Sequence, residues 1–142
     1  MDAAAEKTIS IHDALIYAMV TLSASDRKMT DRELRKIGDV VRSMPIFSGF
    51  DETTLIGVAE ECGRIVREDD GLHAVLASIA ASLPKRLHET AYALTVEVAA
   101  ADFHVEQEEL RFLELLRDVL DLDPLAAAAI EHSARVRYRR TV

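Results

Sequence analysis

Carboxylate side chains recur with the same spacing in two segments of the chain, residues 26–33 and 102–109. Asp26 in the first segment corresponds to Asp102 in the second, and Glu33 corresponds to Glu109. Oxygen ligands of this kind suit hard divalent cations such as Ca²⁺, Mg²⁺ or Mn²⁺. The carboxylates of one or both copies are therefore candidates for converging on a cation.

A purely structural role for the same residues is the competing interpretation. Glu33 follows Thr30 at the spacing of a capping box, and the helix dipole favours a Glu in a first turn. Asp26 and Asp102 are placed near the end of a helix, where the dipole disfavours an anion. Hydrogen bonds from loop N–H groups would have to compensate them. The residues alone leave both interpretations open.

Other metal and phosphate motifs do not match the chain. An EF-hand loop that began at Asp26 would place Ile37 at its last ligand position. A zinc-protease helix that began at His88 would need a second histidine where Tyr92 stands. No Glu-x-x-His and no glycine-rich phosphate loop occurs. His104, in the second loop, is a candidate nitrogen ligand, but a loop histidine without a metal role is the simpler interpretation.

The elements that must position these residues are helical, because apolar residues recur every three to four positions. Seven helices are expected, at about 9–25, 30–43, 51–65, 70–82, 84–102, 106–120 and 123–138. Asp69 or Asp70 is expected to cap the fourth helix, rather than to form an acidic site with His73. The sequence thus predicts an all-α protein with one domain over residues 1–142 and a core at about 9–138. It is expected to be a single compact bundle in which a helix-loop-helix unit occurs twice.

Several apolar side chains have expected places in this bundle. Met29 and Val105 are expected to fill the core between the two helices of each unit. Phe47 and Phe50 are expected to fold under the loop at 44–50 and staple the third helix, and a partner-binding patch is the alternative. Cys62 follows two glutamates within a helix, so a buried structural thiol is expected rather than a nucleophile.

The composition limits the class of partner. A net charge of −8 disfavours nucleic acid, because phosphate contacts need a dense basic surface. The apolar runs are far shorter than the ~20 residues of a membrane span, and the first residues lack the blocks of a signal peptide. One cysteine allows no intrachain disulfide, which fits a reducing compartment. These features predict a cytoplasmic protein without membrane insertion.

The pattern Ala-x-Asp-x-x-apolar-x-x-x-Glu, found twice in an all-helical chain of this length, resembles the tellurite-resistance TerB family. Relatives of that family include a domain of a membrane-anchored DnaJ-like co-chaperone. The resemblance covers about residues 11–122, and the second copy is the closer match. It implies a bundle of about seven helices and a role in the bacterial response to tellurite or chemical stress. It also implies membrane proteins of the same resistance system as partners, and hence a place at the inner membrane.

The resemblance further implies that the acidic residues bind metal. The implied ligands are Asp26, Glu33, Asp102, Glu109 and, more weakly, Asp31. Asp31 is the weaker candidate because a glutamine takes its place in the second copy. The chain departs from the family in the residue after each Asp, where the family usually has glycine and this chain has Arg27 and Phe103. Arg27 would compete with a cation for the carboxylate beside it.

From these observations we expect a non-enzymatic stress-response module that works through contacts with other proteins. Its candidate cofactor is a divalent cation, with Ca²⁺, Mg²⁺ or Mn²⁺ favoured over Zn²⁺. Two alternatives remain. One is a metalloenzyme whose carboxylates, Asp102 and Glu109, act with His104. The other is a structural scaffold without a metal.

Overall fold

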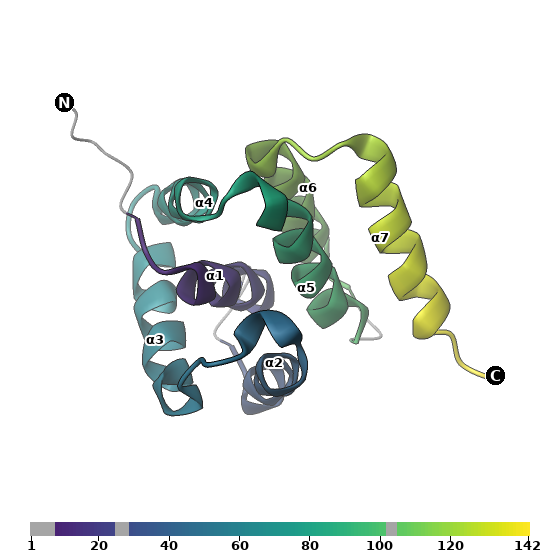
Figure 1. Ribbon diagram of the computed structural model, residues 1–142, viewed down its shortest axis with the longest axis horizontal. Helices are drawn as coiled ribbons and strands as arrows, with labels where there is room; N and C mark the ends of the chain where they lie inside the picture. Colours follow the sequence, from purple (N-terminus) through teal and green to yellow (C-terminus); the bar gives the residue numbers. More distant parts are fainter. Residues whose placement is uncertain (1–7, 25–28, 102–104) are drawn as a thin grey trace.

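Seven α-helices make up the computed structural model, which describes residues 8–24, 29–101 and 105–142 (Figure 1). In chain order the elements, including three short 3-10 helices, are α1 (Ile11–Ser23), α2 (Asp31–Ser43), η1 (Pro45–Phe47), η2 (Glu52–Thr54), α3 (Leu55–Val66), α4 (Gly71–Ser82), η3 (Lys85–Leu87), α5 (His88–Ala100), α6 (Gln107–Leu120) and α7 (Pro124–Arg137). The described residues contain no strand, so the all-α prediction is confirmed. Over the same ranges, no helix is both long and apolar enough to cross a membrane.

α1 lies at the centre of the bundle, with α3 and α4 on one side and α5 on the other (Figure 1). Every residue from 14 to 23 is buried, because helices surround α1 instead of covering a single face. Some polar groups inside the bundle pair with a group on a neighbouring helix. Thr21 and Cys62, for example, form a hydrogen bond of 3.3 Å between their oxygen and sulfur atoms.

The two helix-loop-helix units predicted from the repeat are α1–α2 and α5–α6. Thr30 caps α2 by accepting a hydrogen bond from the Glu33 N–H, and the Glu33 carboxylate accepts one from the Thr30 N–H at 2.8 Å. α6 begins in the same manner, because the Glu109 carboxylate accepts the Glu106 N–H at 3.0 Å. The capping box predicted at Thr30 is thus confirmed, and a counterpart begins the second helix of the other unit.

The apolar residues of the two loops do not have equivalent places. Met29 is partly buried and packs against the core, as predicted. Val105 is 38% exposed, so the prediction that it fills the core is wrong. Its side chain lines an open groove beside α6 instead.

The two phenylalanines of the segment after α2 pack around a histidine of α1. The His12 ring stacks on Phe47 at 5.4 Å and meets the edge of Phe50 at 5.3 Å. The His12 Nε2 atom also lies 2.8 Å from the Ile46 carbonyl oxygen. These rings therefore fold under the loop as predicted, but their ring contacts hold the loop to α1 rather than to the third helix.

The turn between α3 and α4 differs from the predicted cap. Asp70 precedes α4 with a left-handed backbone (φ 59°), and its side chain accepts no N–H of the helix. Its carboxylate lies 2.9 Å from Nδ1 of His73 in the first turn. The helix begins where expected, but the prediction that the Asp70 side chain caps it is wrong.

Hydrogen bonds and an ion pair connect the end of α7 to α2 and α5, which are distant in the sequence. The Tyr138 hydroxyl donates a hydrogen bond to Glu97 of α5 and accepts one from Lys36 of α2 at 3.1 Å. Arg137 forms an ion pair with the same Glu97. The ammonium group of Lys36 lies 5.6 Å from the centre of the Tyr138 ring, so it gains a cation–π contact as well. The contacts fix the Lys36 side chain between α2 and α5.

Candidate functional site

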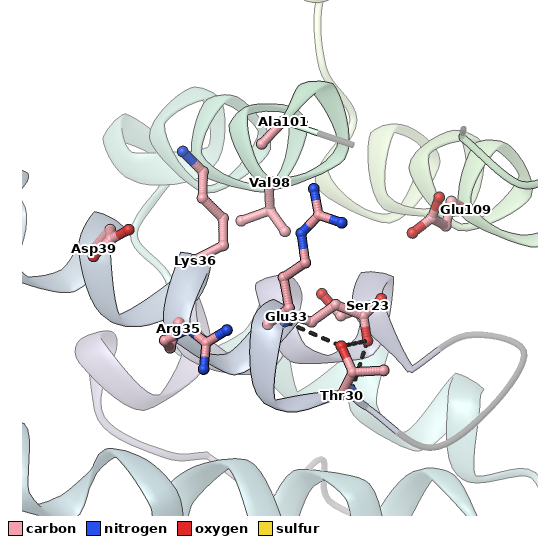
Figure 2. Close-up of a pocket in the computed structure, with 10 residues that line it drawn as sticks. Ser23, Thr30, Glu33, Arg35, Lys36, Asp39, Val98, Ala101 and Glu109 are labelled. Carbon is pink, nitrogen blue, oxygen red and sulfur yellow. Dashed lines mark hydrogen bonds between the residues drawn. The ribbon is translucent and has the colours of Figure 1, made fainter. Parts of the chain in front are cut away.

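A groove of about 560 Å³ lies where the two helix-loop-helix units meet (Figure 2). Its lining comes from the end of α1, the first turns of α2, the end of α5 and the first turn of α6. We call it the inter-repeat groove. Figure 2 shows Glu109 entering it from α6, while Lys36 extends from α2 toward α5.

The inter-repeat groove brings together one glutamate from each copy of the repeat, Glu33 and Glu109. Both carboxylates are held in place, since each accepts the backbone N–H at the cap of its own helix. Glu109 is only 6% exposed. The capping interpretation is therefore correct for both residues, and it places the two carboxylates at one common space.

The other candidate metal ligands do not lie among the described residues that line the groove. Asp31 is exposed in the first turn of α2 and does not line the inter-repeat groove. Asp26, Asp102 and His104 lie outside the described residues, and their roles as ligands stay predictions. The described chain on either side of their loops nevertheless reaches the groove, at Ser23 and Thr30 for the first loop and at Ala101 for the second.

Three basic residues in the groove were not anticipated from the sequence. Arg32, Arg35 and Lys36 of α2 all line it. Neither arginine forms an ion pair with another described residue. Their i, i+3 and i+4 spacing places them on one face of α2, and this was the available signal. The local sequence does not show, however, that this face of α2 lies opposite the second helix-loop-helix unit.

The described donors can be compared with the needs of a divalent cation. Carboxylate and hydroxyl oxygens are the right type for a hard cation. In the described part of the chain, however, no three His, Cys, Asp or Glu side chains are grouped closely enough to hold a metal. Three basic side chains also offset the charge of the three carboxylates that line the groove, Glu33, Asp39 and Glu109. The described residues thus fit a cation in chemistry but not in charge, and further carboxylates such as Asp26 and Asp102 would be needed.

A second groove, of about 590 Å³, lies between α6 and α7 with α5 as its floor. Tyr92 is fully buried there, and its hydroxyl donates to Glu131 of α7. Burial raises the pKa of Tyr92, and the hydrogen bond to Glu131 raises it further. Arg117 of α6 completes the cluster, 2.7 Å from Glu131 and 3.2 Å from the Tyr92 hydroxyl. This cluster closes one part of the groove and joins the three helices.

The single cysteine is part of the core. Cys62 has no exposed surface, and burial raises the pKa of its thiol from about 9 to about 12. The prediction of a buried thiol is confirmed. The raised pKa keeps the thiol protonated near neutral pH, and a protonated thiol is a poor nucleophile.

Comparison with known protein families matches residues 12–132 to the family model described as tellurite resistance protein TerB. The match begins in α1, ends in α7 and contains both helix-loop-helix units. Comparisons with curated proteins and with solved structures gave no match. Since the family model covers most of the chain, including the repeat that suggested the resemblance, the chain belongs to the TerB family of tellurite-resistance proteins.

Proposed function

We propose that this TerB-family chain is a binding module whose inter-repeat groove holds a divalent cation between the two copies of the repeat. The observation that supports it is the presence of Glu33 and Glu109, one from each copy, in the same groove. Both are held by their helix caps, so they need little reorganisation to act as ligands.

The charge of the groove sets a condition on this proposal. Its three basic side chains repel a cation, and its three carboxylates, Glu33, Asp39 and Glu109, do not outnumber them. The cation therefore needs Asp26 and Asp102 as well, the two carboxylates that the repeat would add. An all-oxygen ligand set favours Ca²⁺, Mg²⁺ or Mn²⁺ over Zn²⁺.

Such a cation would act by joining the two loops. Ligands from both copies would link the two helix-loop-helix units at this surface, and the linked surface would then contact other proteins of the same resistance system. The module would act by binding, and the cation would control which surface it presents.

The proposal is tested by titrating Ca²⁺, Mg²⁺, Mn²⁺ and Zn²⁺ while following thermal unfolding. A cation at about a hundred times its Kd should stabilise the protein by ~2.7 kcal/mol, or a rise in Tm of roughly 5–10 °C. The variant Glu33→Gln/Glu109→Gln should lose this shift. Gln keeps the helix caps, because its amide oxygen still accepts the backbone N–H, but it removes two negative charges.

Asp31→Asn is the matched control, because it removes a carboxylate beside the groove that does not line it. It should leave the cation-dependent shift unchanged. The absence of a shift with all four cations would contradict the proposal, as would an equal shift in the double Gln variant. If Asp26→Asn/Asp102→Asn loses stability without added cation and the wild type gains none from it, the two aspartates only stabilise their loops.

A further inference from the structure

The groove between α6 and α7 has an apolar lining that remains open to solvent. Its floor includes Val96 and Ala99 of α5, and its walls include Leu113 of α6 and Ala134 of α7. We call it the α6–α7 groove. α7 packs mainly on α5, beside which it lies in Figure 1. The groove lies between α7 and α6.

Two large apolar side chains at this groove are only partly covered. Leu110 is 49% exposed and Val105 is 38% exposed. Four other large apolar residues of the described chain are exposed as well, but none of them lines this groove: Ile56, Leu125, Val136 and Val142. An apolar stretch that lies in a concave space is typical of a site that binds a partner.

The charges around the α6–α7 groove are not balanced. Arg117 pairs with Glu131 at 2.7 Å, and Arg111 pairs with Glu114 at 3.3 Å. Arg135 of α7 lines the groove but forms no hydrogen bond or ion pair with another described residue. The chain as a whole has a net charge of −8. Arg135, which no described residue pairs, therefore gives this apolar surface a local positive charge on an acidic protein.

We propose that the α6–α7 groove binds an amphipathic helix of another protein, with apolar residues against Val105 and Leu110 and an acidic residue opposite Arg135. Two helices that form walls over a third provide the shape for a helix in a groove. Arg135, which has no ion-pair partner among the described residues, makes the groove complementary to an acidic rather than a basic partner. The inference uses different residues from the cation site and does not depend on it.

Two synthetic amphipathic peptides of about 18 residues, long enough to form a helix, would test this. Both carry the same leucine stripe, and one has glutamates beside the stripe where the other has lysines. Fluorescence anisotropy should show tighter binding of the glutamate peptide, by up to about fivefold. The net charge of −8 would attract the lysine peptide, so a preference for glutamate requires a local cation.

Three variants locate the binding. Arg135→Glu should reverse the preference between the two peptides. Leu110→Glu should weaken binding of the glutamate peptide by about tenfold or more, because it places a like charge on the apolar surface. Leu125→Glu is the matched control, since Leu125 is 80% exposed on α7 but does not line the groove. It should leave the affinity unchanged.

The proposal would be overturned by equal affinity for the two peptides, or by loss of affinity in Leu125→Glu that equals the loss in Leu110→Glu. Amide shifts in a two-dimensional ¹H–¹⁵N spectrum should move at Val105 and Leu110, and movement confined to other surfaces would also contradict it. Sedimentation velocity tests whether a second copy of this chain occupies the groove instead. If the wild type dimerises and Leu110→Glu is a monomer, a second copy of this chain fills the groove and the partner proposal is wrong.

Discussion

Replacing Gly71 with alanine is expected to lower the free energy of unfolding by about 3 kcal/mol or more, or roughly 10 °C in Tm. A Cβ atom at Gly71 would lie 2.0 Å from the Ile65 carbonyl oxygen and 2.7 Å from that of Val66. Both atoms belong to the backbone at the end of α3, so no change of side-chain rotamer removes the clash. The turn from α3 to α4 would have to move. Urea unfolding followed by circular dichroism measures the effect.

Gly57→Ala is the control for this prediction. Gly57 lies in α3, and a Cβ atom there would have no neighbour within 4 Å. Alanine favours helix over glycine, so this variant should gain about 0.5–1 kcal/mol. A Gly71→Ala variant as stable as the wild type would contradict the prediction, because it would mean that the end of α3 leaves room for a Cβ atom at Gly71.

Cys62 of the folded protein is expected to react with a thiol reagent on the order of a thousandfold more slowly than Cys62 of the unfolded chain. The thiolate is the reactive form, and burial raises the pKa from about 9 to about 12. A shift of three units lowers the thiolate fraction near pH 8 by about that factor. The reaction with a disulfide reagent in native buffer and in guanidinium chloride provides the comparison. Equal rates would show that Cys62 is exposed.

The same pKa shift has a consequence for stability at alkaline pH. Between about pH 9 and pH 12 the thiol of the unfolded chain has lost its proton while the folded one keeps it. The unfolded state then binds fewer protons, so stability falls as pH rises through this window and is unaffected below it. Burial also raises the pKa of Tyr17 to about 12, which adds a loss in the same direction. Cys62→Ala should reduce the slope, and an unchanged slope would exclude the thiol as its source.

The helices were predictable because each depends mainly on its own pattern. The apolar period and local signals, such as Thr30 with Glu33, predicted helix starts that the structure confirms. The errors fall where a neighbour decides the outcome. Val105 is exposed because α7 packs on α5 and leaves the space beside α6 open. A single helical pattern contains no information about that choice.

The candidate site was predictable only in part, for a similar reason. The repeat predicted that Glu33 and Glu109 have equivalent places, and both line one groove. The basic side of that groove could not be predicted, because it depends on how α2 faces α5. The Lys36–Tyr138 hydrogen bond joins residues 102 positions apart in the chain, which no local pattern reveals.

The way in which the two repeats pack has a consequence for how such a chain arose. α1 packs against α5, its own counterpart in the other unit, while α1 contacts α6 and α2 contacts α5. The two hairpins thus contact each other through equivalent helices. An isologous dimer, in which both subunits use the same surface, has this pattern of contacts. A two-helix hairpin that paired with its own copy, and whose gene was then duplicated and fused, would produce this arrangement. The two copies are no longer equivalent at the groove, since α2 contributes three basic residues to it and α6 contributes none.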